Sequence, residues 1–439
     1  MPSRRAWLLL PLAAVALALA PSPSRAEMWC ADPLWVHEWG VVVFGSSGAT
    51  RSAGPSLPSH FHRPGGARTG SRGTPARDLP IDSGMRELPV LAFYTAGTWS
   101  PPVPVGIDVG FRDGEATRWF PDVDAFRTLT EVSTPGSRAA RDRLVQERGA
   151  GAASRPAPRD PSRQLVWDVL ELTEQPTHAV TTTTEPWVRA LRDAPRALWA
   201  NRTTTTGVGE SERFVFYEGQ TREQPAIRVT RGPTWSATHR HLLLENTGAH
   251  AVHDVFLVHR DAGHTYVLHV PTIPAHAHAG YVLEEHAVEA SALRAATRDR
   301  LRTALVDPTE SAPPTGHSWG GAPLVRGASA ARWGLGPQTP HGASVPKDQA
   351  FSGPQGCVMQ RNPAVPVDHA TDHRLYAAEI DVVLDAWGAR FFDAQGTTVV
   401  YREDVAQLDA AMPLSLYTDM QHYVQLRRLG LALVENLTL

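Results

Sequence analysis

Short apolar segments recur along residues 27–288, separated by turns rich in glycine, proline and asparagine. The clearest segment places an apolar side chain at every second position: Val103, Val105, Ile107, Val109 and Phe111. That period is typical of a strand with one buried face. Residues 239–285 contain several further apolar runs, divided by Asn-Thr-Gly and Asp-Ala-Gly turns. Such a rhythm predicts a mainly β fold, an antiparallel β-sandwich made of one or two sandwich units.

The pattern changes after residue 288. Residues 290–305 have the pattern of a charged helix, and a second helix carries apolar side chains three or four positions apart: Ile380, Val383, Leu384, Trp387 and Phe391. That spacing puts them on one helix face, and Asp372 is a suitable N-cap. We therefore expect an α+β C-terminal region at 289–439, with a flexible insertion at 307–370. Two loop insertions, at 46–86 and 133–163, are expected in the β-rich region.

The first 26 residues have the three parts of a secretory signal peptide. Arg4 and Arg5 precede an apolar run at 7–20, and Ser24-Arg25-Ala26 follows it. The run is too short to span a bilayer comfortably. We therefore expect a periplasmic or secreted protein that uses the general secretory route. The paired arginines leave twin-arginine export as the alternative. No later apolar stretch reaches the length of a transmembrane helix, so none is predicted in the mature chain.

Charge and cysteine content restrict the partners and the chemistry. The formal net charge of −3 comes from 42 basic and 45 acidic residues, a balance that does not favour nucleic acid. The two cysteines, Cys30 and Cys357, can form one disulfide in an oxidising compartment, and two free thiols are the alternative. The sequence indicates no particular cofactor. A cell-envelope glycan or protein is the class of partner that the predicted location offers.

One motif within a predicted strand carries side chains suited to catalysis. Residues 34–44 are predicted to form a strand, within which Val36-His37-Glu38-Trp39-Gly40 places a histidine, an acid and an aromatic side by side. A tryptophan beside a glutamate can desolvate the carboxylate and raise its pKa, which suits proton transfer. His37 and Glu38 are therefore the candidate catalytic residues. The alternative is a sheet-edge strand with its aromatic side chain packed inward and Glu38 at the surface.

Histidine pairs suggest a metal site without identifying the metal. His60/His62, His239/His241 and His276/His278 are each spaced by two residues, which on a strand puts both rings on one face. The group His37, His60 and His62 is the best of these candidates. The alternative is that these histidines are ordinary polar residues of strands and turns.

Two further patterns have simpler explanations. Gly316-His-Ser318-Trp-Gly320 matches the G-x-S-x-G motif of α/β-hydrolases, but that motif needs a buried strand before the serine. Asp307–Thr315 is instead rich in proline, so we expect a chance match. Thirteen tryptophans suit carbohydrate binding, since sugar faces stack on aromatic rings. The loop-proximal candidates are Trp99, Trp119, Trp187, Trp199 and Trp235, and packing in the core is the alternative for each.

Several short sequence segments, taken in their order along the chain, resemble those of an uncharacterised family of secreted bacterial proteins with an N-terminal His-Glu-Trp-Gly motif. They are His37–Gly40, Pro89–Tyr94, Arg118–Pro121, Glu212–Tyr217, the helix around Trp387, and Met412–Leu416. Val41-Val-Val-Phe44 departs from the Thr-Phe-Thr that commonly follows the motif, and 307–370 is additional. The resemblance implies secretion and a shared fold, and it implies no activity.

Together these patterns favour a binding or interaction module. The first alternative is a hydrolytic or metal-assisted enzyme that uses His37 and Glu38, and the second is a carbohydrate-binding β-sandwich protein. The candidate binding residues are Trp39, His62, Tyr217 and Trp387. The sequence alone does not place these residues near one another.

Overall fold

The structure is a computed structural model of the chain. It describes residues 34–44, 55–63, 84–94, 103–111, 114–127, 164–203, 207–221, 223–236, 238–261, 263–306, 373–418, 424–437 and 439. Several sequence predictions fall outside these residues: the leader at 1–26, the pair Cys30 and Cys357, the insertions at 133–163 and 307–370, Asp372, and the motif around Ser318.

The largest sheet has eight strands, which come from both ends and from the middle of the described sequence. Its strands, from edge to edge, are β13 (His264–Ile273), β12 (Val252–Asp261), β15 (Gly396–Arg402), β17 (Val424–Leu437), β1 (Leu34–Phe44), β2 (Gly84–Tyr94), β9 (Phe214–Thr221) and β4 (Glu115–Phe120). The central pair, β1 and β17, is parallel, whereas the other neighbours in this sheet are antiparallel. Among the described strands, the last in sequence therefore lies beside the first.

Two smaller antiparallel sheets accompany it. One contains β16 (Leu414–Thr418), β3 (Val103–Gly110), β6 (Gln164–Thr173), β7 (Trp199–Thr203) and β8 (Gly209–Glu212), with β5 (Ala125–Arg127) paired to β6. The other contains β10 (Ile227–Arg231), β11 (His241–Asn246) and β14 (His278–Val282). We call them the six-stranded and the three-stranded sheet.

Helices form the remaining layer. They are α3 (Pro186–Arg192), α4 (Ala290–Leu305), α6 (Ala377–Gly388) and the π-helical turn η4 (Ala389–Asp393). Their apolar side chains pack with one face of the large sheet in a single core that includes Leu293, Ile380 and Trp387. The short 3₁₀ helix η3 (Leu283–His286) follows β14, and α7 (Val405–Ala411) lies between β15 and β16.

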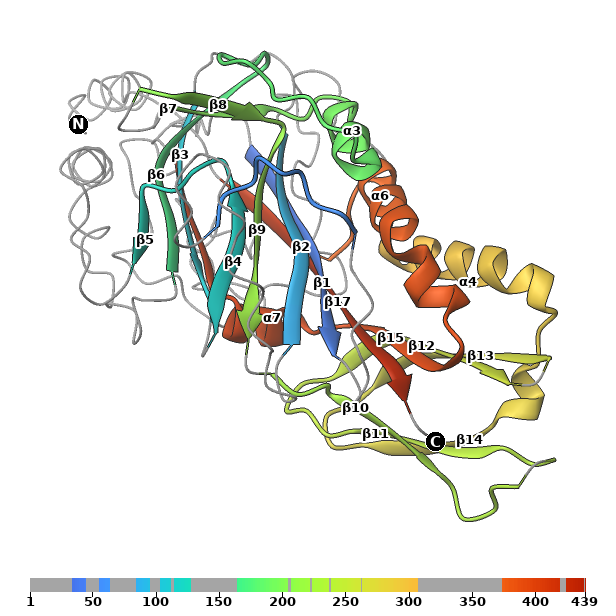
Figure 1. Cartoon of the computed structure of the whole chain (residues 1–439). Helices are drawn as coiled ribbons and strands as arrows, with labels where there is room; N and C mark the ends of the chain where they lie inside the picture. Colours follow the sequence, from blue (N-terminus) through green and yellow to red (C-terminus); the bar gives the residue numbers. More distant parts are fainter. Residues whose placement is uncertain are drawn as a thin grey trace, which may run out of the picture.

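The opposite face of the large sheet covers two separate cores. Leu34 and Val36 of β1 pack with the six-stranded sheet. Val42 and Phe44, further along the same strand, pack with the three-stranded sheet. Figure 1 shows the resulting arrangement, with the helices α3, α4 and α6 on one side of the large sheet and the smaller sheets on the other. One long sheet therefore serves two sandwich-like packings.

The mainly β fold with C-terminal helices is confirmed. The predicted helix at 290–305 is α4. The second predicted helix is α6, continued by η4, and the five side chains of its predicted apolar face, from Ile380 to Phe391, are all buried. That second helix begins at Ala377, with Tyr376 as its N-cap, and Phe391 belongs to the π-helical turn. The strands β15, β16 and β17, all after residue 288, complete sheets that begin before it. Within the described residues, none of the helices combines the length and apolarity needed to cross a membrane.

Candidate functional site

His37 and Glu38 are neighbours on β1, and their side chains lie on opposite faces of the large sheet. Successive residues of a strand alternate between the two faces. His37 accordingly contacts Glu379 of α6, on the helix side. Glu38 contacts Tyr217 and Arg428, on the side of the smaller sheets. The two residues proposed as one acid–base pair therefore belong to two different sites.

Glu38 is the centre of a buried ionic cluster. Its carboxylate accepts hydrogen bonds from the Tyr217 hydroxyl and from Nε and Nη2 of Arg428, the last at 2.9 Å. Nη1 of Arg428 donates to Asp409, and Nη2 also donates to the Met412 carbonyl at 2.9 Å. Glu38 and Arg428 face each other across the parallel β1–β17 pair. Strand register therefore creates this ion pair between residues 390 positions apart.

Burial sets the electrostatics of this cluster. Glu38 is 1% exposed, and Arg428 and Tyr217 are 0% exposed. Burial, followed by the negative charge of Glu38, raises the pKa of Tyr217 well above its ordinary value. Burial alone would lower the pKa of Arg428, but the carboxylates of Glu38 and Asp409 overcome this and raise it. The tyrosine therefore stays protonated, and the arginine stays charged.

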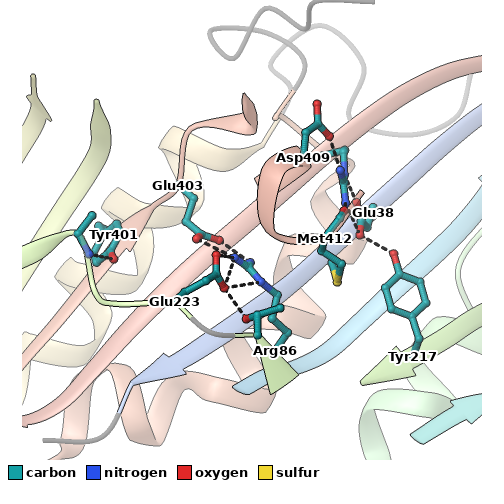
Figure 2. Close-up of polar contacts among 11 residues, drawn as sticks. Glu38, Arg86, Tyr217, Glu223, Tyr401, Glu403, Asp409 and Met412 are labelled. Atoms are coloured by element: carbon teal, nitrogen blue, oxygen red, sulfur yellow. Dashed lines mark hydrogen bonds and ion pairs between the residues drawn. The ribbon is translucent and has the colours of Figure 1, made fainter. Parts of the chain in front are cut away.

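A second ionic cluster lies further along the same face of the sheet (Figure 2). Arg86 of β2 donates to Glu403 through Nη1 at 2.6 Å and through Nη2 at 3.0 Å. The same guanidinium donates to Glu223 through Nε at 3.1 Å and through Nη2 at 2.7 and 2.8 Å. Arg86 is 3% and Glu403 is 2% exposed. One arginine thus holds two carboxyl groups in the interior.

The two clusters lie between the core of the six-stranded sheet and the core of the three-stranded sheet. We call their seven residues the polar seam: Glu38, Tyr217, Asp409 and Arg428 in the first cluster, and Arg86, Glu223 and Glu403 in the second. On β1, Glu38 stands between Val36 of one core and Val42 of the other. The polar seam therefore separates two apolar cores that share one sheet.

Two paired glycines make room in the polar seam. Gly40 and Gly430 are opposite each other in the β1–β17 register, two residues after Glu38 and Arg428. A Cβ atom on Gly430 would lie 2.5 Å from Oε2 of Glu403, and one on Gly40 would lie 3.1 Å from Cα of Pro89. A cavity of about 10 Å³ remains between the clusters, lined by Glu38 and Arg86 among others. That volume holds at most one water molecule.

His37 forms a second, smaller site on the helix side. Its Nδ1 lies 2.7 Å from Oε2 of Glu379, and the two side chains are 0% and 1% exposed. The rings of Tyr94 and Tyr376 lie 5.2 and 4.5 Å from the imidazole. Burial, and then the charge of Glu379, raises the pKa of Tyr94 well above its ordinary value. Nε2 of His37 has no hydrogen-bond partner among the described residues.

The remaining predicted binding residues lie apart from the polar seam. Trp39 and Trp387 are fully buried in the core beneath the helices, and the Arg390 guanidinium lies 4.9 Å from the Trp387 ring centroid. His62 is partly exposed, and its Nε2 lies 2.8 Å from Oε1 of Glu210. Of the four predicted binding residues, Tyr217 alone contacts Glu38. In the part of the chain that the structure describes, no three histidine, cysteine or acidic side chains are grouped to hold a metal.

Sequence reasoning missed the partners in both sites, above all Arg428, Glu379, Arg86 and Glu403. A usable signal was present for Arg428. It lies within Leu426-Arg-Arg-Leu-Gly-Leu-Ala-Leu-Val434, an apolar run of the kind that forms a buried strand. A charged residue in such a run is almost never buried without a partner. The run therefore predicts a buried counter-charge, although it does not say which residue supplies it.

The comparisons with known proteins add no relative. No protein-family model matches this chain, and no curated protein matches it. The functional argument therefore depends on the geometry of these residues.

Proposed function

We propose that this chain is an exported protein that provides a binding or interaction surface in the cell envelope. The observation that supports it most is that the side chains of His37 and Glu38 both make buried structural contacts. His37 joins the large sheet to α6, whereas Glu38 joins β1 to β9 and β17 within that sheet and, through Arg428, to Asp409 of α7. The most reactive residues of the motif thus stabilise a scaffold. The predicted leader supports export, and resemblance to the secreted family remains a prediction.

The surroundings of Glu38 do not suit a general base. A base must come within hydrogen-bond distance of the proton that it removes from a substrate. Both carboxylate oxygens of Glu38 are already engaged by Arg428, and Oε1 also accepts from Tyr217. We therefore assign Glu38 a structural role.

The surface that we propose for the interaction is the outer face of the three-stranded sheet. Its inner face packs Val229 and Leu244 into the core, so the alternating residues point outward. Arg228 and Glu245 are opposite each other in the register, with His278 beyond, and the first two side chains are 63% and 41% exposed. Charged, exposed residues of both signs fit a polar protein partner.

A glycan partner receives less support. Stacking on sugars needs an exposed aromatic ring. Trp119, Trp187 and Trp199 are at most 9% exposed, Trp235 is partly buried, and Trp99 lies outside the described residues. Among the described residues the one large apolar side chain that is exposed is Val208. We therefore favour an envelope protein over a glycan.

Site-specific crosslinking tests this proposal. A photo-reactive amino acid at Thr230, exposed on the outer face, should give an adduct with an envelope protein in cells, and Arg228→Glu should abolish it. The matched control is the same group at Ala296, exposed on α4. The captured protein, once identified, should bind the purified chain with the same dependence on Arg228. Equal adducts at both positions, or binding unaffected by Arg228→Glu, would contradict the proposal.

One observation favours a second candidate, an enzyme that uses His37. Glu379 fixes Nδ1 of His37 at 2.7 Å, which leaves Nε2 as the oriented basic nitrogen. A histidine held in this way suits proton transfer or metal ligation. Metal analysis of the purified protein, with His37→Asn as the comparison, tests it. One equivalent of metal that is lost in His37→Asn would favour the enzyme, and equal metal content in both proteins would count against a metal-assisted reaction.

A further inference from the structure

We propose that the polar seam is a proton-linked lock. In the folded protein Glu403 keeps a proton, and release of that proton loosens α7 from the large sheet. This inference does not depend on the proposed binding function. It follows from the charge balance of the polar seam, from the contacts of each carboxyl group, and from the position of Glu403 in the chain.

The charge balance comes first. The second cluster contains two carboxyl groups, those of Glu223 and Glu403, and one guanidinium group, that of Arg86, so these three side chains carry a net charge of −1 if every group is ionised. The side chains of Glu223 and Glu403 are 12% and 0% exposed. An uncompensated charge in a buried position is unstable and is usually removed by protonation. At least one of these carboxyl groups is therefore expected to hold a proton.

The contacts identify Glu403 as that group. Glu38 accepts hydrogen bonds from two nitrogens of Arg428 and from Tyr217, and it belongs to the other cluster. Asp409 and Glu223 are 14% and 12% exposed, so water reaches both. The Glu403 side chain is 0% exposed. Its guanidinium partner is shared with Glu223, which takes three of the five hydrogen bonds from Arg86.

The charged and titratable groups around Glu403 come from four sides. Arg86 approaches from β2, Glu223 from the segment after β9, Arg428 from β17, and Tyr401 from β15. Burial raises the pKa of Glu403, the charge of Arg86 opposes this, and the charge of Glu223 adds to the increase, so the result lies above the ordinary value of 4.5. The electrostatic surroundings thus agree with the choice made from contacts.

The position of Glu403 links this proton to α7. The next residue, Asp404, is the N-cap of α7 and accepts a hydrogen bond from Ala406 N at 2.8 Å. Leu408 of α7 and Met412 after it pack into the core with the six-stranded sheet. The backbone N–H of Glu403 donates to the Gly430 carbonyl of β17 at 2.9 Å. A second negative charge beside Glu223 therefore repels at the point where α7 joins the large sheet.

The principal test compares the pH dependence of unfolding for the wild-type chain and Glu403→Gln, which imitates the protonated acid. If the folded state keeps the proton that the unfolded state loses, wild-type stability falls relative to the variant as pH rises above 4.5. The expected change is about tenfold in the ratio of folding constants per pH unit, until the folded pKa is reached. A ratio that is flat, or that changes in the opposite direction, would overturn the proposal.

Comparison of the two proteins removes the contribution of other groups. Burial lowers the pKa of His60 to about 4 and that of His373 to about 2, so these histidines make stability rise with pH below 6.5. Both proteins contain them, and their effect cancels in the ratio. Asp409→Asn is the matched control, because Asp409 is the second carboxyl group on the other arginine. The folding constant of Asp409→Asn divided by that of the wild-type chain should not rise with pH. If it rises as much as the corresponding ratio for Glu403→Gln, the proton is not on Glu403.

Hydrogen exchange tests the structural consequence. At a pH above the pKa of Glu403 in the folded protein, the amides of Val405–Ala411 should exchange faster in the wild-type chain than in Glu403→Gln. Amides of α4 should exchange equally in both proteins, since α4 packs on the other face of the sheet. Equal exchange in α7 would overturn the loosening of that helix. An infrared band of a protonated carboxyl group, present in the wild-type chain and absent in Glu403→Gln, would identify the proton independently.

Discussion

The two faces of β1 use adjacent residues in different ways. On the helix side His37 makes one hydrogen bond, with Glu379. On the other side Glu38 shares Arg428 with Asp409 and also accepts from Tyr217. The first site centres on one acid, Glu379, whereas the second is a network in which one arginine contacts two acids. Removing a partner should therefore have a larger effect in the polar seam than at His37.

The largest effect is expected for Arg428→Met. This change removes the guanidinium that contacts both Glu38 and Asp409, and breaking a buried ion pair by removal of one partner costs about 3–5 kcal/mol. Equilibrium unfolding in denaturant measures the loss. Arg427→Met is the matched control on the same strand, because Arg427 is only partly buried and donates to the Arg374 carbonyl. Equal losses for the two variants would remove the special role of the polar seam.

A smaller effect is expected on the helix side. Glu379→Met leaves Nδ1 of His37 buried without its acceptor, and such a group costs about 1–3 kcal/mol. Asp381→Ala on the same helix is the control, since the Asp381 side chain is 37% exposed and exposed ion pairs contribute about 0–1 kcal/mol. The comparison of the two faces fails if Glu379→Met is more destabilising than Arg428→Met.

Gly430→Ala should reduce stability by about 1–3 kcal/mol, the usual range for overpacking. The new Cβ atom would lie 2.5 Å from Oε2 of Glu403, which Arg86 holds in place. In a Glu403→Ala background the colliding atom is absent, so the penalty should shrink. A double-mutant cycle measures this coupling. An unchanged penalty in that background would show that another contact explains the glycine.

The smallest effect is expected for Tyr217→Phe. Glu38 loses one neutral donor but keeps both nitrogens of Arg428. A typical hydrogen bond contributes about 0.5–1.5 kcal/mol. Unfolding measurements at one pH suffice, because the raised pKa of Tyr217 keeps its hydroxyl protonated. A loss as large as that of Arg428→Met would mean that the tyrosine, rather than the arginine, controls the polar seam.

Local patterns predicted much of the fold. The alternating residues of β3 and the apolar face of α6 are visible in the sequence because each depends on the period of one element. The structure brings two of the candidate residues, Glu38 and Tyr217, into contact, although no sequence pattern indicated that they pair. The idea of a joint His37–Glu38 site was not compatible with strand alternation, since neighbours on a strand face opposite ways.

The partners could not be predicted in the same manner. Arg428 is 390 residues from Glu38, and Glu379 is 342 residues from His37. Each contact depends on β17 lying parallel to β1, or on α6 covering that strand, and neither arrangement has a local signal. The apolar run around Arg428 indicates only that a counter-charge lies near it, without identifying the residue that supplies it.

The sequence by itself determined that this chain is mainly β, and where α4 and the apolar face of α6 lie, because these properties depend on periods within single elements. The tertiary structure decided that the first and last strands pair, that two cores share one sheet, and that a polar seam lies between them. Burial and neighbouring charge, which no local pattern specifies, then decide which carboxyl group keeps a proton.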